Sequence, residues 1–175
     1  MRVIGGEFRS RRLKSIAGVA TRPTPDRLRE TLFDILAPRI EGATFLDAYA
    51  GTGAVGIEAL SRGARQAFFL ERNRLALEVI RENLALLGLE PRATVVSGPV
   101  LLTLPRHHAD IVFLDPPYEQ AHERSIALTL LAEAASPLIV VQHSIHLPLA
   151  DSHGGLERTR IVKQGDNALS FFRLR

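Results

Sequence analysis

Short apolar segments alternate with helical segments along most of the chain, and this alternation constrains the fold more than any other feature of the sequence. Strands are expected at the start of ATFLDAYAGTG, in QAFFLERN up to Glu71, and over residues 93–98, 109–115 and 136–144. Helices are expected after the glycine-rich turn up to Gly63, in RLALEVIRENLALLG, and over residues 121–135. Because consecutive parallel strands need crossover helices, the pattern predicts an α/β fold, a mainly parallel sheet with helices on both faces.

Two further segments flank this alternating region. Thr24 and Pro25 have the character of a helix cap and a first helical position, and the apolar spacing that follows predicts a helix ending before Pro38. Near the other end, ERTRIVKQG and NALSFFRLR flank residues 165–167 and predict an antiparallel hairpin at one edge of the sheet. A length of 175 residues suits one domain, residues 1–175, with a basic N-terminal arm at residues 1–22.

The composition excludes several classes of protein. Hydrophobic residues make up 46% and charged residues 23% of the chain, which is typical of a globular protein rather than a disordered one. No apolar run approaches the ~18 residues of a membrane-spanning helix, and MRVIGGEFRSRR lacks the apolar core of a signal peptide, so we expect a cytoplasmic protein. The absence of cysteine excludes disulfides, thiolate metal sites and a cysteine nucleophile.

Positive charge is concentrated at the start of the chain. Residues 1–22 contain six basic side chains against the single acid Glu7, so this arm carries a net charge of +5 and the rest of the chain −2. A basic arm on a nearly neutral body is typical of proteins that bind nucleic-acid phosphates, although a solvated segment would have the same composition. The candidate RNA-binding residues are Arg2, Arg9, Arg11, Arg12, Lys14 and Arg22.

A glycine-rich loop, Gly51 to Gly56, follows the first strand and precedes a helix in the pattern G-x-G-x-x-G, and Glu71 lies twenty residues beyond its first glycine. This pattern is typical of dinucleotide-binding proteins. However, the carboxylate of Asp47, four residues before the loop, would repel a pyrophosphate and attract the ammonium and sulfonium groups of S-adenosylmethionine. Glu71 would then accept hydrogen bonds from ribose hydroxyls. Asp47 could instead only order the loop, and Glu71 could be a capping or surface acid.

The tetrapeptide Asp115-Pro116-Pro117-Tyr118 directly follows the fourth strand, at the sheet edge where open α/β folds bind ligands. An exocyclic amine of a nucleic-acid base is a poor nucleophile because its lone pair is delocalised into the ring. Two acceptors, the Asp115 carboxylate and the Pro116 carbonyl, could orient that amine, and the prolines would stiffen the turn. Tyr118 could stack on a base flipped out of its helix. The alternative is a turn that merely ends a strand.

Taken together, these residues resemble the small-subunit ribosomal RNA guanine-N(2) methyltransferases of the RsmD type. The matching segments are RVIGGEFRSRRL, TRPTPDRLRETLFDIL, FLDAYAGTGAVGIEALSRGA, FLERN and DIVFLDPPY, which together span residues 2–118. The resemblance implies a Rossmann-like class I methyltransferase fold of seven strands, S-adenosylmethionine as cofactor, and methylation of a guanine 2-amino group in 16S ribosomal RNA. It also implies that the arm contacts RNA and that TRPTPDRLRET packs over the amino-acid end of the cofactor.

The expected site residues follow from the motifs and from this resemblance. The catalytic set is Asp115, Pro116, Pro117 and Tyr118, and the cofactor-binding set is Thr24, Arg27, Asp47, Tyr49, Gly51, Thr52, Gly53, Glu71, Arg72, Gly98 and Val100. The chain departs from the pattern at two places. The third strand ends in Ser97-Gly98-Pro99 without the acid that often meets adenine, and the fifth ends in Gln142-His143, where a glutamate would be expected. No metal is expected, because the histidines lack partners at metal-ligand spacing.

Two other functions stay open at this point. A DNA adenine or cytosine amino-methyltransferase would use the same tetrapeptide, but such enzymes usually carry an added target-recognition domain, for which 175 residues leave no room. An NAD-binding Rossmann protein would explain the glycines but not Asp47 or the tetrapeptide. We expect ribosomal RNA, within a small-subunit assembly, to be the partner.

Overall fold

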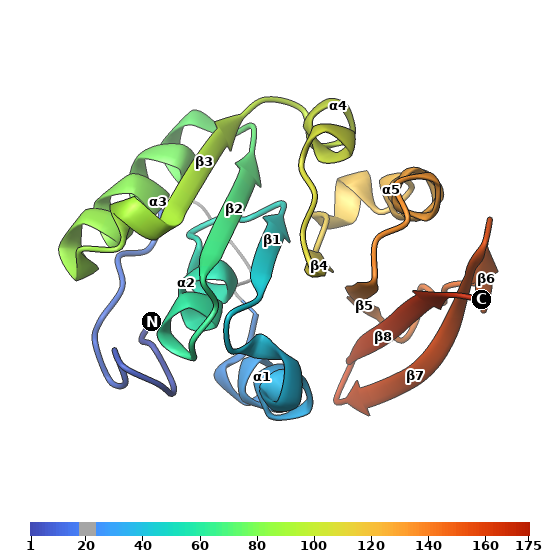
Figure 1. Cartoon of the computed structure of the whole chain (residues 1–175), viewed down its shortest axis with the longest axis horizontal. Helices are drawn as coiled ribbons and strands as arrows, with labels where there is room; N and C mark the ends of the chain where they lie inside the picture. Colours follow the sequence, from blue (N-terminus) through green and yellow to red (C-terminus); the bar gives the residue numbers. More distant parts are fainter. Residues whose placement is uncertain (18–23) are drawn as a thin grey trace.

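The computed structural model describes residues 1–17 and 24–175 (Figure 1). Its eight described strands join in one sheet, in the order β3-β2-β1-β4-β5-β8-β7-β6. The pairs among β1 to β5 are parallel, and β8, β7 and β6 are added antiparallel at one edge. The strands are β1 Thr44–Ala48, β2 Gln66–Glu71, β3 Ala93–Ser97, β4 Ile111–Leu114, β5 Leu138–Ser144, β6 Ser152–His153, β7 Leu156–Gln164 and β8 Asn167–Leu174.

Helices cover both faces of this sheet, as the alternating sequence predicts (Figure 1). They are α1 Asp26–Ile40, α2 Ala54–Ser61, α3 Arg74–Leu87, α4 Val100–Thr103 and α5 Glu123–Glu133, with 3-10 turns η1 Glu90–Arg92, η2 Leu104–Arg106 and η3 Tyr118–Gln120. Residues of α1, α2 and α3 pack with Phe45 in one buried cluster, and residues of α4 and α5 pack with Leu46 in the other. Neighbouring strand residues therefore serve opposite faces.

The central strands are apolar on both sides because both sides are covered. All four residues of β4 are buried, and so are six of the seven in β5. Such runs without polar alternation are typical of parallel strands between two helical layers. The expected seven strands are β1 to β5, β7 and β8, and the structure adds the two-residue β6. The α/β class, with its antiparallel C-terminal hairpin, is confirmed.

One predicted boundary is wrong. Helix α1 does not end before Pro38 but continues through it to Ile40, and its N-cap is Pro25 rather than Thr24. Pro38 lies in the last turn, where its missing N–H removes only one helical hydrogen bond. The last turn is held by burial instead, because Leu36 and Ile40 are 1% and 4% exposed.

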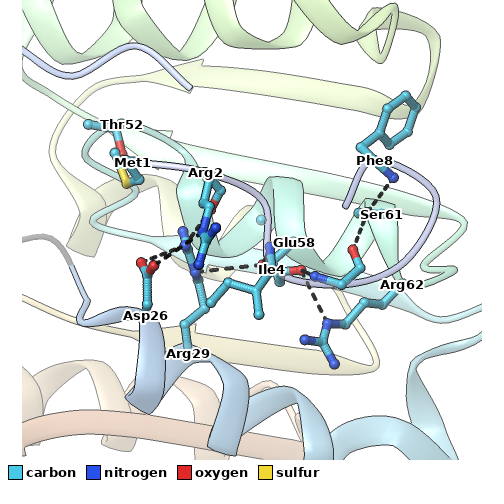
Figure 2. Close-up of polar contacts among 12 residues, drawn as sticks. Met1, Arg2, Ile4, Phe8, Asp26, Arg29, Thr52, Glu58, Ser61 and Arg62 are labelled. Atoms are coloured by element: carbon cyan, nitrogen blue, oxygen red, sulfur yellow. Dashed lines mark hydrogen bonds and ion pairs between the residues drawn. The ribbon is translucent and has the colours of Figure 1, made fainter. Parts of the chain in front are cut away.

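The N-terminal arm is folded against the body of the protein, so its described part is not a solvated segment (Figure 2). Its first residues form a small hairpin in which the Val3 N–H donates to the Arg11 carbonyl at 2.9 Å. Glu58 of α2 accepts from the N–H groups of Ile4 and Gly5, at 2.8 and 3.0 Å. Gly6 is required here, because a Cβ would lie 2.0 Å from the Ser61 carbonyl oxygen.

A buried charge pair lies beneath this hairpin (Figure 2). The side chains of Arg29 on α1 and Glu58 on α2 are both fully buried, with 3.6 Å between Nε and Oε1. Arg29 also donates from Nη2 to the Arg2 carbonyl at 2.6 Å. Because a buried ion is costly unless it is paired, this network fixes the arm to the first two helices. Among the helices described, none is both long enough and apolar enough to cross a bilayer.

Candidate functional site

Three acidic residues meet at the carboxyl edge of the sheet. Asp47 lies in β1, Glu71 ends β2, and Asp115 directly follows β4. Because β1 pairs in parallel with both β2 and β4, the ends of these strands come together at one edge. Segments that are 68 residues apart in the sequence thus form one acidic site, as the motif positions predict.

Asp47 and Glu71 hold the glycine loop in place. The buried Asp47 carboxylate accepts from the N–H of Gly56, in the first turn of α2, at 2.9 Å. It thereby serves a helix whose N-cap is Gly53, a residue with no side chain to cap it. Glu71 accepts from the Gly51 N–H at 2.8 Å and, through its other oxygen, from two N–H groups of the turn after β2.

This arrangement argues against a dinucleotide at the same helix. In dinucleotide sites the N-terminus of the helix after the glycine loop binds the pyrophosphate. In this protein that position is already occupied by a protein carboxylate, Asp47. The loop-ordering role that the sequence left open for Asp47 is therefore present. Because a carboxylate has about four acceptor sites, Asp47 can order the loop and still accept hydrogen bonds from a ligand.

Burial and mutual repulsion make this site favourable for a cation. Burial raises the pKa of Asp47 well above its ordinary value, and the charges of Asp115 and Glu71 raise it further, while the Gly56 hydrogen bond opposes the shift. Burial also raises the pKa of Asp115, to about 7, although a hydrogen bond with the Thr24 side chain lowers it. A positively charged ligand placed among these acids would stabilise their ionised forms.

The glycine loop leaves room for a ligand on one side and packs tightly on the other. Gly51 and Gly53 have φ of 58° and 82°, the left-handed region that glycine adopts without strain, and nothing lies within 4 Å of a Cβ built on Gly51. In contrast, a Cβ on Gly56 would lie 2.4 Å from the Phe69 ring. Thr52 is buried within the loop, and its carbonyl accepts from the Asn83 side chain at 3.1 Å.

The tetrapeptide lies at the end of β4, as expected. Asp115 and Pro116 are partly exposed, and Pro117 and Tyr118 are exposed, with 53% of Tyr118 accessible. Tyr118 begins η3, which leads into α5. An exposed aromatic ring three residues after a partly buried carboxyl is a combination that can receive a flat, polar base.

Tyr49 and Arg72, in the loops after β1 and β2, each contact the segment that follows the tetrapeptide. Neither partner, Glu123 or Gln120, was predicted from the sequence. The Tyr49 hydroxyl donates to Glu123 at 2.5 Å. The Arg72 guanidinium faces the Gln120 amide, whose oxygen accepts from it in the amide orientation that satisfies both groups. Tyr49 has a φ of 62°, which is uncommon outside glycine. Burial and the Glu123 carboxylate raise the pKa of Tyr49. The only signals for these contacts in the sequence are that Tyr49 lies two residues after Asp47 and that Arg72 directly follows Glu71.

The remaining expected cofactor residues lie around this edge in different settings. Gly98 has a φ of 144° and donates its N–H to the Glu71 carbonyl at 3.1 Å, and Val100 is buried at the start of α4. Arg27 is exposed on the first turn of α1. Thr24, directly before α1, is buried and donates its hydroxyl to the side chain of Gln142 at 3.0 Å.

His143, next to Gln142, is turned to a different part of the molecule. Its Nε2 lies 2.8 Å from the hydroxyl of the buried Ser170, and its Nδ1 lies 3.0 Å from the Ser144 carbonyl. Since a carbonyl can only accept, Nδ1 carries the proton and Ser170 donates to Nε2. Burial lowers the pKa of His143. In residues 1–17 and 24–175, no group of three or more potential ligand side chains is placed to hold a metal ion.

Among the basic residues of the arm that the structure describes, two form ion pairs and three are exposed. Arg2 lies 3.9 Å from Asp26, and Lys14 lies 2.8 Å from Glu82. The side chains of Arg9, Arg11 and Arg12 are exposed on the folded hairpin. Arg22 lies outside the residues that the structure describes.

Comparison with known proteins agrees with this geometry. Solved structures place the fold among the class I methyltransferases: "Putative methyltransferase yhhF from Escherichia coli" superposes with a TM-score of 0.86 and 31% identity over 100% of this chain and 98% of that one. The family model described as "Conserved hypothetical protein 95" matches residues 1–173, so the chain belongs to that family, which is the RsmD type.

Two relatives carry the same name. Ribosomal RNA small subunit methyltransferase D of Escherichia coli K12 is 38% identical over 94% of this chain and 86% of its own length. Its namesake in Haemophilus influenzae is 39% identical over 73% of this chain and 69% of its own length. The predicted family is therefore confirmed.

Proposed function

We propose that this protein transfers a methyl group from S-adenosylmethionine to the 2-amino group of a guanine in small-subunit ribosomal RNA. One observation carries the proposal: Asp115-Pro116-Pro117-Tyr118 lies at the same sheet edge as the glycine loop, which Asp47 holds in place. Its relatives named ribosomal RNA small subunit methyltransferase D support ribosomal RNA as the substrate. A cytoplasmic location belongs to the same proposal.

The residues at this edge fit the proposed cofactor. S-adenosylmethionine carries an ammonium and a sulfonium, and Asp47, Glu71 and Asp115 form an acidic cluster that disfavours an anion. Open space before Gly51 allows close approach of a ligand to the backbone. We assign the cofactor to Asp47, the glycine loop with Thr52, and Glu71. The further contributors we propose are Tyr49, Arg72, Gly98, Val100, Thr24 and Arg27.

The catalytic task of the protein is to orient an amine. The cofactor supplies an activated methyl group when it is bound. The Asp115 carboxylate and the Pro116 carbonyl accept hydrogen bonds from the two amine hydrogens, which favours a tetrahedral nitrogen whose lone pair is aimed at the methyl. Tyr118 stacks on the base, and Asp115 accepts best when ionised.

The folded arm supports an RNA substrate. Arg9, Arg11 and Arg12 are exposed on a hairpin that the Arg29–Glu58 pair fixes to the catalytic body. Fixed cations hold a phosphate backbone in one register, which a mobile segment would not do. We propose that they bind RNA phosphates, together with Arg2, Lys14 and Arg22. A DNA amino-methyltransferase is the second candidate, because the tetrapeptide would serve it equally.

Labelled methyl donor and three substrates test this function. Naked small-subunit ribosomal RNA, assembled small subunits and duplex DNA are each incubated with the protein, and the modified nucleoside is identified. We expect N2-methylguanosine from an RNA substrate, whereas methylated adenine or cytosine in DNA would overturn the proposal.

Asp115 variants test the assigned chemistry. Asp115→Ala removes one of the two acceptors, so we expect methyl transfer to fall roughly 10² to 10³-fold, with cofactor affinity by calorimetry unchanged. Asp115→Asn keeps an acceptor oxygen, and substantial retained activity would mean that Asp115 orients the amine without taking its proton. Full activity in both variants would refute the assignment of the tetrapeptide to the catalytic site.

A further inference from the structure

A chain of hydrogen bonds reaches Asp115 from the neighbouring strand. The Thr24 hydroxyl donates to Oε1 of Gln142 at 3.0 Å, and both side chains are only 8% exposed. The same Thr24 side chain lies close enough to Asp115 to lower the pKa of that carboxyl by hydrogen bonding. The strand register brings Asp115 and Gln142 to neighbouring positions, because each directly follows a residue of the Leu114–Val141 pair of β4 and β5. Thr24 thus bridges two strand ends.

The bridge has two hydrogen-bond arrangements, because the Thr24 hydroxyl can donate to only one partner at a time. The Thr24 hydroxyl has one proton, and in the observed arrangement it goes to the Gln142 oxygen. Towards Asp115 the hydroxyl then offers only lone pairs, which suits a protonated carboxyl. When Asp115 is ionised, the hydroxyl must donate to it, and Gln142 must present its NH₂ group instead. An amide can supply either partner, whereas a carboxylate in its place could only accept.

We propose that Thr24 and Gln142 are positioning residues that hold the Asp115 carboxyl in its working orientation and accommodate both of its protonation states through the rotatable amide. This inference rests on the proposed function for its consequence in catalysis. It assigns a role to Gln142, for which the sequence predicted none. It also gives Thr24 a contact with the catalytic carboxyl besides its proposed place near the cofactor.

The charged surroundings of Asp115 set the direction of the expected effects. Asp47 on β1 and Asp115 repel each other, and Glu71 on β2 also repels Asp47, so these neighbouring charges are acidic. From the segment before α1, Asp115 meets the uncharged Thr24, whose hydroxyl donates to the uncharged Gln142 of β5. The ionised form of Asp115 therefore depends on the Thr24 hydroxyl as a donor. Removing that donor, or diverting it, must favour the protonated form.

Thr24→Val and Gln142→Glu test the bridge. Valine removes the hydroxyl, and an ionised glutamate keeps the hydroxyl donating away from Asp115. In both variants we expect the rise of kcat with pH to move about one pH unit higher, the size of one hydrogen bond to a charged group. Thr24→Ser should restore the wild-type profile.

A matched control exists in the same chain. Gln164 on β7 donates to the Thr31 hydroxyl at 3.1 Å, so Gln164→Glu makes the same substitution in another glutamine–threonine pair. We expect it to leave the pH profile unchanged. A shift as large as that of Gln142→Glu would mean a general charge effect and would overturn the inference.

A titration that needs no substrate separates this inference from the proposed function. The carboxyl carbon of Asp115, identified by its loss in Asp115→Asn, is followed by ¹³C NMR from pH 4 to 9. We expect a higher pKa in Thr24→Val and Gln142→Glu than in the wild type and Thr24→Ser. Unchanged titrations would overturn the bridge even if RNA is methylated. Shifted titrations in a protein that methylates no RNA would support the bridge and refute the function.

Discussion

Replacing Asp115 by asparagine should stabilise the fold at neutral pH while it lowers activity. Burial raises the pKa of Asp115 from 3.8 to about 7, so the folded protein keeps a proton that the unfolded chain has already released. Between these two values the unfolded state binds fewer protons, and stability must therefore fall as pH rises from about 4 to 7. Asparagine does not titrate and escapes this loss.

The magnitude follows from the same two values. The interval of about three pH units corresponds to about 4 kcal/mol at 1.36 kcal/mol per unit, which is an upper limit. Because Asp115 is partly exposed, solvent screening reduces the gain to roughly 1 to 3 kcal/mol. The gain should be near zero at pH 4, grow up to pH 7 and then stay constant. Asp47 is present in both proteins, and losing the Asp115 charge lowers its raised pKa, which stabilises the variant in the same direction.

Urea unfolding of wild type and Asp115→Asn at pH 4.5, 6 and 8 measures this difference. The free energy of unfolding should favour the variant increasingly with pH, at an unchanged denaturant slope. Asp115→Ala serves as a control for the lost hydrogen bond with Thr24. A variant that is less stable than wild type at pH 8, or a difference independent of pH, would refute the reasoning that Asp115 is held at a cost in the folded state.

Two further outcomes are expected. Gly56→Ala should destabilise the fold by roughly 1 to 3 kcal/mol by overpacking, because the new Cβ would lie 2.4 Å from the Phe69 ring; thermal unfolding measures this, and an unchanged melting temperature would contradict the close packing. Replacing Arg9, Arg11 and Arg12 together by alanine should weaken RNA binding and reduce its salt dependence, by about 0.7 to 1 in slope per lost phosphate contact, with cofactor affinity unchanged. Filter binding over a salt series checks this, and an unaltered slope would assign those charges to solubility alone.

The folded arm changes how the last experiment should be designed. Val3 and Leu13 belong to the main buried cluster, so truncating the arm would expose core residues as well as remove charge. Substitution of exposed arginines leaves the hairpin and its contacts with Glu58 in place. The charge pattern alone could not show this, because net charge carries no information on which side chains are anchored.

Sequence periodicity is enough to predict the layers of the fold and the sheet edge at which the candidate site lies. Alternating apolar and helical segments require a parallel sheet with covered faces, and the positions of Asp47, Glu71 and Asp115 at strand ends bring them to one edge. These inferences succeed because periodicity and strand direction are local properties of the chain. Helix α1 is an exception, since packing of Ile40 extended it beyond a proline that local rules treat as a stop.

The partners of individual polar groups, in contrast, follow from the three-dimensional packing of the chain. Thr24 and Gln142 are 118 residues apart, and Tyr49 and Glu123 are 74 apart, so no local pattern connects them. The anchoring of the arm by Glu58 depends in the same way on the packing of α1 against α2. Burial makes an unpaired polar group costly, but it leaves open which of several groups satisfies it. That choice is made by the relative placement of strands and helices, which the sequence encodes only through the whole fold.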